Sequence, residues 1–117
     1  MQNDKQLLIE SIKILEDKKV ENLKVIEVSE AMPIADYFLI GTVDSVPQAN
    51  SVTEELNQKL KNLGYQQITR KNSNQREWIL IDFNSVIIHL FTKEKRDFYN
   101  LEGLWLKYVK TIDQVKE

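Results

Sequence analysis

The stretch from Trp78 to Phe91 limits the folds open to this 117-residue chain more than any other stretch does. It contains two apolar runs, rich in β-branched residues, on either side of a short polar break at residues 82–85. Two such runs around a short break are typical of a β-hairpin. Asn84 lies in the break and can adopt the positive φ that a tight hairpin turn requires. The sequence therefore predicts two adjacent antiparallel strands.

The turn of this hairpin determines which side chains share a face. A two-residue turn at residues 83–84 places Trp78 opposite His89, whereas a three-residue turn moves His89 to the apolar face. We prefer the two-residue turn because it leaves one face wholly apolar, and a one-residue slip would exchange the two faces. In this register the apolar face carries Ile79, Ile81, Val86, Ile88 and Leu90.

The other face of the hairpin is mixed in character. Its apolar residues are Trp78, Leu80, Ile87 and Phe91, and its polar residues are Asp82, Ser85 and His89. A second layer of helices over the sheet would bury both faces, and it would explain the apolar side chains without any partner. An uncovered face would instead be a partner-binding surface, because a large apolar patch with a polar rim is typical of one. The residues alone leave both interpretations open.

The remaining segments alternate between helical and strand patterns. Apolar residues at three- and four-residue spacing predict helices, and short apolar runs predict strands. Pro47 suits the first turn of the second helix, and Gly64 suits its end. Residues 30–33 form a connector, and residues 70–76 form a positively charged polar loop. Helices are predicted near residues 4–18, 47–63 and 98–108, and strands near 23–29, 37–42 and 65–69.

The element order α-β-β-α-β-β-β-α predicts one α/β sandwich domain over residues 1–117. We expect a mixed sheet of about five strands with helices packed on it. The core of the domain should cover residues 4–108. A short, exposed C-terminal tail with alternating charges should follow it.

Composition excludes several classes of protein. The net charge is −2, and domains that bind nucleic acid through phosphates usually carry a basic surplus, so we expect little direct nucleic-acid contact. The absence of cysteine and the presence of one histidine exclude thiolate sites and multi-histidine metal sites. No run approaches the ~20 apolar residues of a membrane span, and no leader sequence is apparent. We expect a soluble, cytoplasmic protein without membrane contact.

The residues also give no indication of an enzyme. Metal-assisted phosphoryl transfer requires paired carboxylates, but no Asp-x-Asp occurs on a predicted strand. The three glycines lack the spacing of a phosphate-binding loop or a dinucleotide fingerprint. Asp82, Ser85 and His89 lie along a flat strand pair without an oxyanion donor nearby. We therefore expect no catalytic residue, no bound metal and no cofactor.

Four segments carry a family resemblance. They run from Ile34 to Thr42, from Glu77 to Asp82, from Val86 to Phe91 and from Arg96 to Trp105. In this order and at this spacing, the chain resembles the ribosomal silencing factor family, also called Iojap-like, over about residues 4–108. Each segment alone is a weak signal. The combination, with its Tyr-x-Leu-Glu-x-Leu-Trp ending, is specific.

The resemblance implies both a fold and a function. The family has a nucleotidyltransferase-like α/β fold that lacks the catalytic carboxylates. Its members bind large-subunit ribosomal protein fourteen on the 50S subunit, block joining of the small subunit and repress translation when nutrients are limiting. Free members form homodimers. Two alternatives remain: a large-subunit assembly factor that uses the same contact, and a residual nucleotidyltransferase.

The resemblance also implies which residues contact the partner. Two departures from the family pattern bear on this implication. Asn84 stands where the family usually has glycine, and residues 43–45 replace a small polar run, which leaves the role of that loop open. The positions that match the family as candidate contacts are Trp78, Asp82, His89, Arg96, Tyr99, Leu104 and Trp105.

Overall fold

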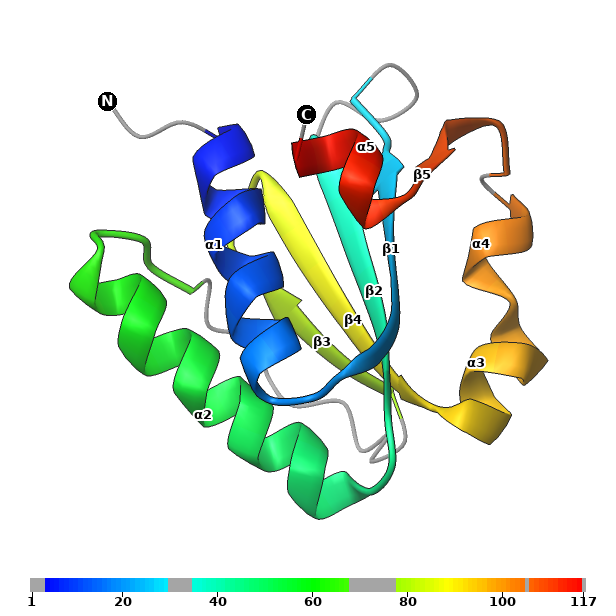
Figure 1. Ribbon diagram of the computed structural model, residues 1–117, viewed down its shortest axis with the longest axis horizontal. Helices are drawn as coiled ribbons and strands as arrows, with labels where there is room; N and C mark the ends of the chain where they lie inside the picture. The colour runs from blue at the N-terminus through cyan, green and yellow to red at the C-terminus, as the bar shows by residue number, and fades with distance from the viewer. Residues whose placement is uncertain (1–3, 30–34, 68–77, 105, 117) are drawn as a thin grey trace.

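A five-stranded mixed sheet with the strand order β3-β4-β2-β1-β5 forms the middle of the protein (Figure 1). The computed structural model describes residues 4–29, 35–67, 78–104 and 106–116. Strands β2 and β4 are parallel, and the other neighbouring pairs are antiparallel, as expected for a mixed sheet. The strands are β1 (Glu21–Glu27), β2 (Tyr37–Val43), β3 (Trp78–Asp82), β4 (Val86–Thr92) and β5 (Val109–Lys110).

Helices cover both faces of this sheet, but unequally. Two long helices, α1 (Asp4–Asp17) and α2 (Val46–Asn62), lie on one face together with the short helix α5 (Ile112–Lys116), and the short helices α3 (Lys93–Tyr99) and α4 (Leu101–Leu104) lie on the other (Figure 1). None of the described helices is long and apolar enough to cross a membrane. The short C-terminal helices are α3 (Lys93–Tyr99), α4 (Leu101–Leu104), the 3-10 turn η1 (Leu106–Tyr108) and α5 (Ile112–Lys116).

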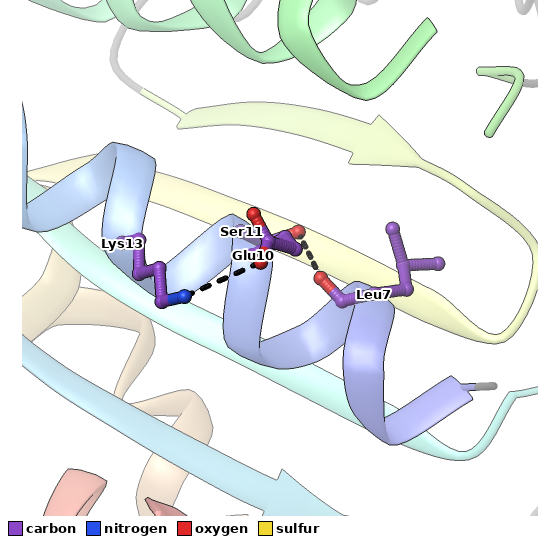
Figure 2. Close-up of polar contacts among 4 residues, drawn as sticks. All are labelled: Leu7, Glu10, Ser11 and Lys13. Atoms are coloured by element: carbon purple, nitrogen blue, oxygen red, sulfur yellow. Dashed lines mark hydrogen bonds and ion pairs between the residues drawn. The ribbon is translucent and has the colours of Figure 1, made fainter. Parts of the chain in front are cut away.

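The larger core lies between the sheet and the α1–α2 layer. The predicted apolar stripes of both helices are buried there, together with the apolar face of the hairpin. Ser11 is buried in the α1 stripe, and its hydroxyl donates to the Leu7 carbonyl at 2.8 Å, while the Lys13–Glu10 ion pair faces outward (Figure 2). A buried hydroxyl with a partner avoids most of the desolvation cost. The buried hydroxyl of Ser11 is therefore compatible with the apolar core between α1 and the sheet.

The hairpin forms as predicted, but its predicted register is wrong by two residues. Trp78 pairs with Phe91, and Phe83 N–H donates to the Val86 carbonyl at 2.9 Å, so residues 84 and 85 form the turn. Asn84 adopts a φ of 76°, and its N–H donates to the Asp82 carboxylate at 2.7 Å. This bond moves the turn one residue along the chain and leaves Phe83 buried. Because the shift is an even number of residues, the predicted faces are confirmed.

The C-terminal region differs most from the prediction. Residues 109–116, expected to form an exposed tail, instead form β5, which pairs with β1, and α5, which buries Val115. The predicted helix near residues 98–108 begins earlier and is interrupted at Asn100, which adopts a left-handed φ of 45°. The strand predicted at residues 65–69 is absent from residues 65–67. Its last two residues, the connector at 30–33 and the loop at 70–76 lie outside the described residues.

Candidate partner-binding surface

The face of the sheet opposite α1 and α2 carries an aromatic cluster. Ring centroids lie 5.0 Å apart for Trp78 and Phe91, and 4.7 Å apart for Trp78 and Tyr99. Between the neighbouring strands β2 and β4, the rings of Phe38 and His89 meet edge to face, with their centroids 4.9 Å apart. These separations are typical of stabilising aromatic pairs. The aromatic cluster, defined as Phe38, Trp78, His89, Phe91 and Tyr99, joins β2, β3 and β4 to helix α3.

This cluster runs from the interior to the surface. Phe91 is fully buried, whereas Trp78 and Tyr99 are half-buried. Beyond them, Leu80 on β3 is 41% exposed, and Phe98 on α3 is 76% exposed. Both interpretations of the mixed face therefore apply in part. A thin helical layer covers the inner strands, and an apolar edge remains exposed at β3 and α3.

Trp78 is held in place by a hydrogen bond to His89. The indole Nε1–H donates to Nδ1 of His89 at 3.2 Å, which places the imidazole proton on Nε2. His89 is buried, and burial lowers its pKa from the usual 6.5 to about 4. The neutral imidazole is therefore the form that accepts from Trp78 at neutral pH.

The lowered pKa of His89 predicts that acid weakens the fold. Because the unfolded chain binds the proton more readily, the contribution of His89 is fully present above pH 6.5 and is lost as the pH falls towards 4. At pH 5 the loss in free energy of unfolding should reach about 2 kcal/mol. Urea denaturation at pH 7.5 and pH 5 measures it. The variant His89→Gln does not titrate and should lose less stability than the parent; equal losses would contradict the assignment.

Two of the candidate contacts serve the interior of the chain. Asp82 is buried and accepts the Asn84 N–H that closes the hairpin turn. Arg96 is buried on α3, and its Nη1 donates to the Asn22 carbonyl at 2.5 Å and to Thr42 Oγ1 at 2.9 Å. Because their polar atoms are buried and hydrogen-bonded inside the chain, Asp82 and Arg96 would affect partner binding by positioning the hairpin turn and helix α3. Their predicted role in partner contact stays a prediction.

The other candidates divide between the cluster and the surface. Trp78, His89 and Tyr99 belong to the aromatic cluster, and Leu104 on α4 is 76% exposed. Trp105 lies outside the described residues. Sequence reasoning did not single out Phe98 as a contact, although it is as exposed as Leu104. Its position beside the matched Tyr99 was the signal that could have found it.

The described residues offer no metal site. Among residues 4–29, 35–67, 78–104 and 106–116, no group of three or more His, Asp or Glu side chains is placed to hold an ion. A carboxylate cluster is what metal-assisted phosphoryl transfer would require. What this surface presents is apolar and aromatic area, which is suited to contact with another macromolecule.

Comparison with known proteins identifies the family of the chain. The model of the family described as "Ribosomal silencing factor during starvation" matches residues 1–117. A ribosomal silencing factor from Halalkalibacterium halodurans is 32% identical over 103 residues, which cover 88% of each chain. A mouse protein named "Mitochondrial assembly of ribosomal large subunit protein 1" is 31% identical over 99 residues, or 80% of this chain and 42% of the mouse protein.

A solved structure shares the fold. The crystal structure of a protein from Chromobacterium violaceum superposes with a TM-score of 0.82 at 25% identity and covers 89% of this chain and 87% of its own. With a family model that matches over its full length, the chain belongs to the ribosomal silencing factor family.

Proposed function

We propose that this protein binds the 50S ribosomal subunit through large-subunit ribosomal protein fourteen and blocks joining of the small subunit. Translation would then be repressed under nutrient limitation. Family membership supports the connection with ribosome silencing. The observation that carries the proposal is the exposed apolar edge beside the aromatic cluster.

This edge has the composition of a protein-binding surface. Leu80 on β3, Phe98 on α3 and Leu104 on α4 are large apolar side chains exposed to solvent. Trp78 and Tyr99, on the same strand and helix as Leu80 and Phe98, are half-buried. Exposed apolar area that continues from a half-buried aromatic cluster is typical of interaction sites, and aromatic residues often dominate the energy of an interface. The edge therefore suits a partner that offers apolar surface.

The charge of the protein favours a protein partner over ribosomal RNA. The net charge is −2, so the chain lacks the basic surplus that phosphate contact would require. A cytoplasmic protein that acts by steric occlusion needs no catalytic residue, metal or cofactor. We also propose that the free protein forms a homodimer, in line with the family resemblance.

Occlusion predicts stoichiometric inhibition of subunit joining. Purified 30S and 50S subunits are mixed with increasing amounts of protein, and 70S formation is followed by light scattering. Inhibition should saturate near one protein per 50S subunit, and preformed 70S should resist because its joining face is already covered. Equal inhibition of preformed and unformed 70S would sink the occlusion model.

A matched pair of variants locates the surface in the same assay. Leu104→Asp should weaken 50S binding by about tenfold, because it places a charge in the proposed contact. Leu63 at the end of α2 is 51% exposed and lies apart from the aromatic cluster, so Leu63→Asp is the control and should bind as the parent does. Equal loss in both variants would argue against this surface.

A second candidate is assembly of the large subunit, favoured by the name of the mouse relative. Both functions would use the same contact on the large subunit. Sucrose gradients of cells that lack the protein separate the two. An assembly factor leaves incomplete 50S particles during growth, whereas a silencing factor leaves complete particles and excess 70S in starvation.

A further inference from the structure

Arg96 connects helix α3 to strands that are distant from it in sequence. It is buried, and its Nη1 donates to the Asn22 carbonyl on β1 and to Thr42 Oγ1 on β2. A buried cation is costly unless hydrogen bonds compensate for the lost water. Moving α3 would break these hydrogen bonds and leave the charge buried without them, so the two bonds restrict where α3 can lie.

The acceptor on β1 is available because the strand is bulged. The register of β1 against β2 shifts between Glu21 and Lys24, so two residues of β1 lie opposite Gly41. Asn22 in the bulge has a φ of 54°. The extra residue of a bulge is not paired in the ladder, so its backbone carbonyl is free to accept from another group. A Cβ on Gly41 would lie 2.4 Å from Val20 Cγ1, so the close approach requires glycine. The bulged residue Asn22 and its neighbour across the sheet, Thr42, together form the acceptor site for Arg96.

Arg96 acts on the aromatic cluster through its own helix. Tyr99 follows it by three residues, so both side chains lie on the same side of α3. The Tyr99 ring lies 4.7 Å from the Trp78 ring and 6.2 Å from the Phe91 ring. Helix α3 has only seven residues, too few to be stable without tertiary contacts. The position of Tyr99 on Trp78 therefore depends on how α3 is anchored.

We propose that Arg96 is a positioning residue of the partner-binding surface: it fixes α3 to the β1 bulge and to Thr42, and so holds Tyr99 against Trp78. The relevance of this position for binding rests on the proposed function. The positioning itself is a property of the free protein. The two can therefore be tested by separate measurements.

The first measurement follows Trp78 directly. Protein labelled with 5-fluorotryptophan is examined by fluorine NMR, and Trp105→Phe identifies which of the two signals belongs to Trp78. Arg96→Met removes the hydrogen bonds and should shift the Trp78 signal, because the nearby rings of Tyr99 and Phe91 move. Lys93→Met removes the same charge from an exposed position on α3 and should leave the signal unchanged. A Trp78 signal unchanged in folded Arg96→Met would overturn the proposal.

The second measurement is co-sedimentation with 50S subunits at a temperature where each variant is folded. Arg96→Met should bind about tenfold more weakly than the parent. A variant that melts lower but binds like the parent would make Arg96 purely structural, and that result overturns the proposal. If the parent itself does not bind 50S subunits, the proposed function is overturned instead. The fluorine signal of Trp78 then still tests whether Arg96 positions α3.

Thr42→Val covers the case in which Arg96→Met does not fold. It removes one acceptor of Arg96 and nearly preserves the volume of the side chain. We expect a smaller shift of the Trp78 signal in the same direction. No shift in this folded variant would count against the anchoring role of the Thr42 contact, and the proposal would fail.

Discussion

Trp78→Ala should weaken binding to the 50S subunit by about thirtyfold or more, which corresponds to ~2 kcal/mol. The indole is the largest side chain at the boundary between the buried aromatic cluster and the exposed edge. Its removal takes away an aromatic anchor and the contact that supports Tyr99. Co-sedimentation with 50S subunits at fixed salt measures the loss.

The same substitution should also lower the free energy of unfolding by about 2 kcal/mol, because the indole is half-buried rather than fully buried. Trp78→Phe is the control: it keeps a ring beside Phe91 but loses the hydrogen bond to His89. We expect it to retain most of the stability. If folded Trp78→Ala binds 50S subunits as tightly as the parent, Trp78 is not part of the interface.

Phe91→Ala should cost about 4 kcal/mol of stability, the largest loss we expect from a single substitution on this face. Phe91 is fully buried between the sheet and α3, with ring contacts to Trp78, His89 and Tyr99. Truncation leaves a cavity that the neighbouring β-strands cannot close. Chemical denaturation followed by far-UV circular dichroism measures the loss.

Phe98→Ala is the matched control for Phe91→Ala, because it makes the same chemical change at a position that is 76% exposed. Its effect on stability should stay within about 0.5 kcal/mol, as for most surface substitutions. Similar losses at positions 91 and 98 would mean that Phe98 is covered in solution. The predicted homodimer would then be the first explanation to test.

Alternation along the hairpin was enough to predict its faces. Side chains on a strand alternate with a period of two, so the separation of Trp78, His89 and Phe91 from Ile81 and Ile88 follows from the sequence. The turn was harder to predict, because the carboxylate of Asp82 competes for the backbone of residue 84. That competition moved the pairing without moving any side chain to the wrong face.

The interior role of Arg96 could not be predicted from its residue type. Arginine is rarely buried unless it is paired, and one of the two acceptors of Arg96 is a backbone carbonyl freed by a bulge. A bulge depends on how β1 and β2 pair, which local patterns do not reveal. The family resemblance implies a partner contact for Arg96, and that role stays a prediction; the exposed apolar residue beside Tyr99 is Phe98.

Strand β5 could not be predicted because two residues are too few to show the alternation of apolar and polar side chains that indicates a strand. Val109 and Lys110 form a strand only through pairing with β1, supported by an ion pair of 3.2 Å between Lys110 and Glu27. Tertiary context of this kind overrides local propensity. Lys110, one of the charges that suggested an exposed tail, instead pairs at the edge of the sheet.

The pairing of β5 with β1 has a consequence for synthesis of the protein. The outermost ladder of the sheet joins residues 25–26 to residues 109–110, so the two partners leave the ribosome at different times. Until the second partner emerges, β1 presents an unpaired edge to other nascent chains, and such edges promote aggregation. Contacts of high sequence separation also form slowly. The edge of β1 is therefore open to such contacts from the synthesis of β1 until β5 has emerged.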